Sequence, residues 1–125
     1  KKEQINQEKH AASMLYFDLM SIEDYLKNER GSVNIRYSSD WQNMISNCAI
    51  LSPDNIKKLY KIYDLIYNYH YRLREEKGNV RKESILEYQL LKENMFWYEN
   101  NSIDMERRNN DYQEIMDLLQ KKYGE

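Results

Sequence analysis

Residues 52–73 read SPDNIKKLYKIYDLIYNYHYRL, a stretch that carries both a helix start and a long apolar face. Ser52 is a preferred N-cap residue, the proline after it suits the first helical position, and the next aspartate places negative charge in the first turn. Gly78 is the first glycine after this stretch, and glycine favours a helix end. The sequence therefore predicts a helix from Ser52 to Lys77.

The polar residues of this helix share about one third of its circumference. On a helical wheel they are Lys57, Lys58, Lys61, Asp64, Asn68, Arg72, Glu75 and Glu76. The rest of the surface carries isoleucine, leucine and tyrosine side chains, together with His70. Because neighbours must cover so wide an apolar face on several sides, we expect this helix to lie at the centre of the fold.

Further helices are predicted where apolar residues recur at spacings of three and four. The first spans about 3–29, with a stripe formed by Ala12, Leu15, Leu19, Ile22 and Leu26. Others are expected over 81–98 and from Ile103 to Tyr123. A short helix is expected around Trp41, Met44, Ile45 and Cys48.

The segment 32–39 is predicted to be an extended loop. Val33, Ile35 and Tyr37 alternate with polar residues as in a strand, but the sequence offers no obvious second strand. We therefore expect an all-α fold, a helical bundle of four to five helices with one extended loop packed on it. The chain has the length of a single domain, 1–125, in which residues 1–10 are expected to form a juxtamembrane or linker extension.

The composition favours a folded, helical chain despite a mean hydropathy of -0.99. The chain has 12 tyrosines, 6 methionines and 2 tryptophans, and a tyrosine ring buries a large area while its hydroxyl stays in water. Valine, which favours strands, is rare. The single cysteine, Cys48, excludes an internal disulfide framework and is typical of a reducing compartment such as the cytoplasm.

Several kinds of functional site are not expected. The net charge of -2 provides no general attraction for nucleic acid or anionic lipid. The glycines, at 31, 78 and 124, are too far apart to form a phosphate-binding loop. Neither His10 nor His70 has an aspartate, glutamate or histidine three or four residues away, so no metal site is expected. We therefore expect no catalytic residue and no cofactor.

Two residues with reactive side chains are expected to be structural. His70 lies near the middle of the apolar arc of its helix and is predicted to be buried, with a tyrosine hydroxyl as its partner. Cys48 has no histidine near it in sequence, so we expect it to pack as a small hydrophobic side chain. The tyrosines of 60–71 are expected to form core rather than to stack on bases, because the basic residues lie mostly on the opposite side.

The predicted helix over 81–98 has apolar residues on two separate sides. One stripe is Tyr88, Leu91, Met95 and Tyr98, and the other is Leu86, Leu90 and Trp97. A helix of this kind contacts two layers. The second layer is either a partner protein, which makes Leu86, Leu90 and Trp97 a candidate interface, or the short helix and the extended loop of the same chain.

Residues 9–26, KHAASMLYFDLMSIEDYL, resemble the start of the cytosolic part of small proteins from low-GC bacteria and their mobile elements. In those proteins one N-terminal membrane helix leads through a charged stretch into a helical domain. The resemblance implies a longer native chain and a membrane contact only through a segment outside these residues. It implies no activity and no functional residues.

Three functions follow from these observations. We expect a non-enzymatic helical protein-interaction module that self-associates, located in the cytoplasm and tethered to the membrane in the full-length protein. The alternative is a small phage or mobile-element protein that binds and inhibits a host protein. The third is a nucleic-acid binder or an enzyme whose site forms from scattered residues. A basic or concave pocket around His70 would favour the third function, and an exposed apolar patch would favour the first two.

Overall fold

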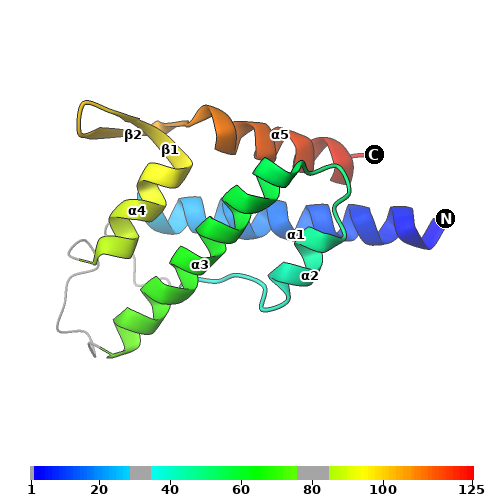
Figure 1. Cartoon of the computed structure of the whole chain (residues 1–125), viewed down its shortest axis with the longest axis horizontal. Helices are drawn as coiled ribbons and strands as arrows, with labels where there is room; N and C mark the ends of the chain where they lie inside the picture. Colours follow the sequence, from blue (N-terminus) through cyan, green and yellow to red (C-terminus); the bar gives the residue numbers. More distant parts are fainter. Residues whose placement is uncertain (1, 29–34, 76–84) are drawn as a thin grey trace.

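The computed structural model describes residues 2–28, 35–75 and 85–125. Within these ranges the fold is mostly helical, with one small β-hairpin beside the helices (Figure 1). The elements in chain order are α1 (Lys2–Lys27), α2 (Trp41–Ser46), α3 (Pro53–Glu75), α4 (Leu86–Met95), β1 (Phe96–Glu99), β2 (Ser102–Arg108) and α5 (Asn110–Tyr123). The predicted helical bundle is confirmed in outline, but the all-α class is wrong because residues 96–108 contain two paired strands.

Helices α1 and α5 lie side by side and run in opposite directions (Figure 1). Helix α3 crosses this pair obliquely and packs against α2, α4 and α5, as expected of a central helix. The prediction that its tyrosines form core is wrong in part, because Tyr60, Tyr67 and Tyr71 are exposed. Residues 2–10, predicted as an extension, continue α1 as helix. None of the helices described is both long enough and apolar enough to cross a bilayer.

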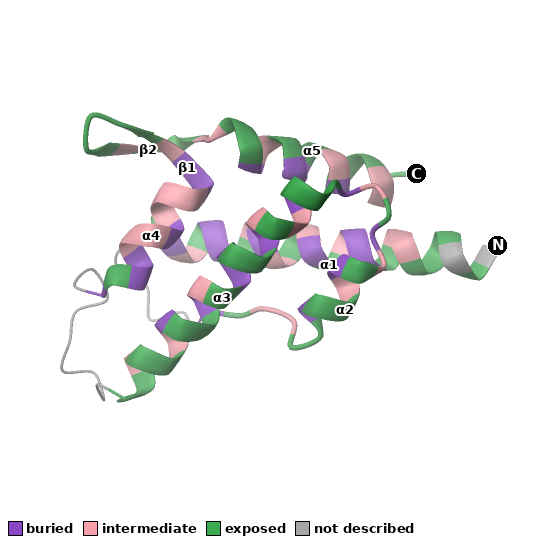
Figure 2. Ribbon diagram, viewed as in Figure 1, coloured by how far each residue is buried: buried purple, intermediate pink, exposed green. Residues whose placement is uncertain are grey.

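The core forms where the apolar faces of the helices meet (Figure 2). The stripe predicted for α1, Ala12, Leu15, Leu19, Ile22 and Leu26, is fully buried. From α3 the buried residues are Leu59, Ile62, Tyr63, Ile66 and Tyr69, and from α5 they are Tyr112, Ile115, Met116 and Leu119. The spacing of three and four residues in the sequence is therefore the spacing of the core.

Helix α3 starts where the sequence predicts it. The Ser52 hydroxyl accepts a hydrogen bond from the backbone N–H of Asn55 at 3.1 Å, and the Asn55 side-chain oxygen accepts one from the backbone N–H of Ser52 at 2.9 Å. This reciprocal arrangement is a capping box, which satisfies backbone donors that the first turn leaves without partners. The predicted end at Lys77 lies outside the described residues.

The hairpin corrects two predicted helix boundaries. Helix α4 ends at Met95 instead of residue 98, and the last helix starts at Asn110 instead of Ile103. Asn100 and Asn101 have φ values of 52° and 62°, which place both in the left-handed conformation of a tight hairpin turn. The strands on either side pair antiparallel, with an irregularity between Phe96 and Trp97.

A buried charged group joins the hairpin to α1. The carboxylate of Glu23 accepts hydrogen bonds at 3.1 Å from Nε of Arg108, at the end of β2. It also accepts a hydrogen bond of 2.6 Å from the hydroxyl of Tyr112 in α5. Burial and the neighbouring carboxylate raise the pKa of Tyr112 well above its usual value, so the phenol stays neutral and donates.

Candidate binding groove

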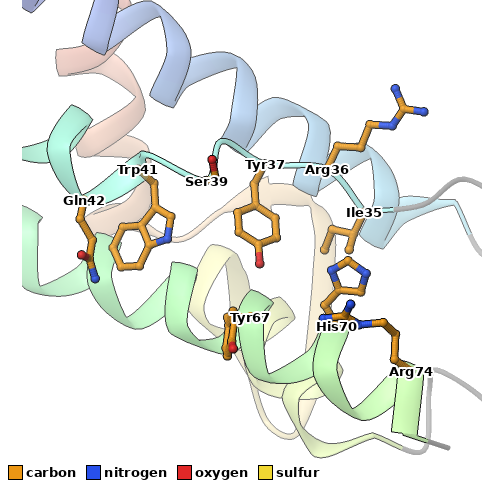
Figure 3. A pocket seen from close by; sticks show the side chains of 9 residues that line it. All are labelled: Ile35, Arg36, Tyr37, Ser39, Trp41, Gln42, Tyr67, His70 and Arg74. Carbon is orange, nitrogen blue, oxygen red and sulfur yellow. The ribbon is translucent and has the colours of Figure 1, made fainter.

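A groove of about 780 Å³ lies between residues 35–42 and one face of α3 (Figure 3). Its lining residues are Ile35, Arg36, Tyr37, Ser39, Trp41, Gln42, Tyr67, His70 and Arg74. In Figure 3 the rings of Tyr37 and Trp41 extend from one side toward α3, and Tyr67, His70 and Arg74 form the other side. The groove is thus built from two segments that are distant in sequence.

The segment 35–40 that forms one wall, here called the connector, is held in place by Asp18 of α1. The Asp18 carboxylate accepts hydrogen bonds from the backbone N–H of Ser38 at 2.9 Å and from its hydroxyl at 3.1 Å. The same carboxylate accepts a hydrogen bond of 3.0 Å from the hydroxyl of Tyr63 in α3. Because this one side chain binds both the connector and α3, it ties the two walls of the groove together.

Trp41 forms the inner wall at the start of α2. Its indole stacks on the Tyr63 ring with the centroids 4.7 Å apart and the planes 4° apart. The edge contact with the ring of Tyr60 has a centroid distance of 5.0 Å. These contacts hold the Trp41 ring in one orientation, so this wall is preorganised.

His70 is not the buried core histidine that the sequence predicts. It is half-buried and lines the groove, whereas its neighbour Tyr69 is fully buried. The difference arises because the connector leaves a hollow over α3 at this position. The predicted tyrosine partner is also wrong, since the His70 side chain makes no hydrogen bond with any residue that the structure describes.

The groove presents polar side-chain groups that no described residue binds. Among residues 2–28, 35–75 and 85–125, no hydrogen bond or ion pair occupies the side chains of Tyr37, Trp41, Tyr67, His70 or Arg74. An indole N–H and a guanidinium can only donate, and a neutral tyrosine hydroxyl can donate as well. The lining is therefore rich in donors.

The pKa of the Tyr37 hydroxyl depends on its burial and on two neighbouring groups of the lining. Burial raises this pKa above its usual value, the neighbouring Tyr67 raises it further, and Arg74 lowers it. Tyr37 therefore remains a neutral hydrogen-bond donor at physiological pH.

The charge of the lining is positive. Arg36 lies at the rim and points away from the floor, and Arg74 lies beside His70 (Figure 3). No aspartate or glutamate is among the described residues that line the groove. Asp18, behind the connector, already accepts three hydrogen bonds, and the Asp40 carboxylate accepts one from Asn43.

This arrangement provides the groups that a binding site needs. Aromatic faces supply apolar contact, and the arginines supply donors for an anionic group. A general acid–base pair needs a second group that orients the histidine, and the described lining residues include no carboxylate beside His70.

The candidate interface residues of the sequence analysis do not form one helical stripe. Leu86 of α4 is 66% exposed, Leu90 is half-buried, and Trp97 lies in β1 rather than on the helix. The guanidinium of Arg107 covers the Trp97 ring at 3.7 Å from its centroid. The exposed part of the predicted interface is therefore centred on Leu86.

The other residues considered from sequence lie apart from the groove lining. Cys48 is buried, and its pKa is raised to about 12, chiefly by burial, so it behaves as the predicted hydrophobic side chain. Lys58 donates to Asn94 at 3.4 Å, and burial lowers its pKa. In the described part of the chain no group of three or more His, Cys, Asp or Glu side chains could hold a metal ion.

The sequence contained one signal for this groove. The alternation of Ile35 and Tyr37 marked a strand-like segment without a partner strand, and this segment is now one wall. No local pattern linked it to Arg74, because their proximity depends on the path of the chain through α2. Comparison with protein-family models, curated proteins and solved structures finds no match to this chain.

Proposed function

We propose that this domain is a non-enzymatic protein-interaction module and that the groove along α3 is its binding site. The observation that carries the proposal is the set of aromatic rings and hydrogen-bond donors on preorganised walls, donors that no residue of 2–28, 35–75 or 85–125 occupies. Trp, Tyr and Arg are the residue types that contribute most to binding energy at protein interfaces. Tyr67, which is 58% exposed, is the most accessible aromatic ring of the lining.

A site of this kind also meets the criterion that would favour a nucleic-acid binder or an enzyme. Two features support the interaction module instead. The part of the lining that the structure describes holds no partner that would make His70 a catalytic base. The lysines Lys57 and Lys61 belong to another surface of α3. The same groove would serve the alternative function, a mobile-element protein that captures a host protein.

Peptide display on the purified domain tests the proposal. A random peptide library selected on the native protein should yield sequences that lose binding when Tyr67→Ala or Arg74→Ala is introduced. Tyr71→Ala and Lys61→Ala are matched controls, because both side chains are exposed on α3 outside the groove. Selected peptides that bind the groove variants as well as the native domain, or no enrichment at all, would contradict the proposal.

We also propose self-association, for which the observation is the exposed Leu86 beside the half-buried Leu90 on one face of α4. A two-fold dimer would bring this face against its own copy. Light scattering of the native domain should give twice the mass of 15.4 kDa, and Leu86→Glu should restore the monomer. Glu106→Gln changes an exposed residue on the hairpin and is the control, which should keep the mass of the native domain. A native mass near 15.4 kDa at high concentration would exclude the dimer.

We propose a cytoplasmic location with a membrane tether outside these residues, on the basis of the resemblance of residues 9–26. Cell fractionation of the native gene product tests this. Recovery in the membrane fraction, with the domain accessible only from the cytoplasmic side, is expected. Recovery entirely in the soluble fraction would exclude the tether.

A further inference from the structure

We propose that the occupant of the groove is an acidic, extended segment of a partner protein, with apolar or aromatic side chains between its carboxylates. This inference rests on the proposed function and names the chemistry of the partner. Three features of the described residues lead to it: the donors, the charge, and the unpaired backbone of the connector.

The first two features select for carboxylates. Arg74 carries five N–H donors in a planar fork, a geometry that matches a carboxylate with two parallel hydrogen bonds. Its guanidinium has no partner within the described part of the chain, and the groove lining there contains no acidic residue to compete. The hydroxyl of Tyr37 and the indole N–H of Trp41 add donors for carbonyl oxygens.

The third feature selects for an extended segment. The backbone N–H and C=O groups of Ile35, Arg36 and Tyr37 make no hydrogen bond with any residue that the structure describes. Figure 3 shows this stretch as an open chain running along the groove. An extended peptide can pair with backbone groups that no described residue binds, and its alternate side chains then reach the pockets below.

The same observations disfavour a nucleic acid. Affinity for nucleic acid depends mainly on the number of phosphates that lysine and arginine neutralise. Arg36 and Arg74 are the lysine or arginine side chains of the described lining, and the chain as a whole carries a charge of -2. Two arginines are enough to fix one or two carboxylates of a peptide, whose remaining contacts are apolar.

Calorimetric titration of three synthetic octapeptides tests the inference. The first alternates glutamate with leucine and tyrosine, the second replaces each glutamate with glutamine, and the third replaces each with lysine. We expect the glutamate peptide to bind about tenfold more tightly than the glutamine peptide, the order expected from one charge-assisted hydrogen-bonded pair. The lysine peptide should not bind.

Variants of the domain test whether the preference for the glutamate peptide arises in the groove. Arg74→Glu should abolish binding of the glutamate peptide and create binding of the lysine peptide, whereas Lys61→Glu, a charge reversal outside the groove, should leave both unchanged. A glutamate peptide methylated at alternate backbone nitrogens should bind more weakly, because N-methylation removes donors that pair with the connector. Equal binding of the methylated peptide would overturn the extended mode.

The outcomes separate this inference from the proposed function. Equal binding of glutamine and glutamate peptides, still lost in Tyr67→Ala, would overturn the acidic partner and leave the peptide groove intact. Failure of all three peptides, together with failure of peptide display, would remove both. Binding of a single-stranded oligouridylate that depends on Tyr67 and Arg74 would replace the peptide with a nucleic acid.

Discussion

The hydroxyl of Tyr112 lies 2.6 Å from the carboxylate of Glu23, although the two residues are 89 positions apart in the chain. With Arg108 they form a buried group that joins α1, the end of β2 and the start of α5. The Glu23 side chain is 4% exposed, so the two partners take the place of water around its charge.

Glu23→Ala is expected to lower the free energy of unfolding by about 3 kcal/mol, since it leaves a mostly buried arginine and a buried hydroxyl without their partner. Chemical denaturation followed by circular dichroism measures the loss. Asp24→Ala is the control, because Asp24 is exposed on the same helix. Equal stability of the two variants would mean that the buried pair contributes nothing to the fold.

Asp18→Ala is expected to lower the free energy of unfolding by about 2 kcal/mol, since the Ser38 and Tyr63 groups that it binds lose their acceptor. The connector should loosen, so the glutamate peptide should also bind more weakly. Ser38→Ala removes the hydroxyl donor but keeps the backbone hydrogen bond, and its effect should be smaller. A larger loss for Ser38→Ala would show that the connector is held by other contacts.

His70→Ala is expected to change the free energy of unfolding by no more than about 0.5 kcal/mol, as for other substitutions outside the core. The neighbouring Tyr69→Ala, in contrast, removes a fully buried ring and should cost about 3 kcal/mol or more. Thermal and chemical unfolding of the two variants provide the comparison. A large loss for His70→Ala would restore the core histidine that the sequence predicts.

Stability is expected to fall in alkaline solution through Cys48. Burial, with the nearby Glu8, raises the pKa of its thiol from 9.0 to about 12. As the pH rises past 9, the thiol ionises in the unfolded chain but not in the folded one, so ionisation favours unfolding. Between pH 8 and 10.5 the native protein should therefore lose more unfolding free energy than Cys48→Ala. Parallel pH profiles would contradict this, because the buried tyrosines are common to both proteins.

The helices α1 and α3 could be predicted because their signals are local. The stripe from Ala12 to Leu26 and the cap at Ser52 depend on residues within a few turns of one another, and both are confirmed. The hairpin could not be separated from a helix by spacing alone. Leu91, Met95 and Tyr98 follow one another at intervals of four and three, which continues a helical pattern into β1.

The missed signal was the turn chemistry between the strands. Two successive asparagines tolerate positive φ better than most residues, and an aromatic run precedes them while Ile103 and Met105 alternate after them. The groove was beyond prediction for a different reason. Its lining combines the connector with the end of α3, and only the packing of α2 on both α1 and α3 brings these segments together.

The stacking of Trp41 on Tyr63 gives this protein an optical probe of its own groove. The chain contains only one other tryptophan, Trp97, which lies on the hairpin with its ring under Arg107. Replacing Trp97 with phenylalanine would leave a single indole, and that indole forms a wall of the groove. Its emission would then change when a molecule enters, so ligands of every class could be screened on the unlabelled protein.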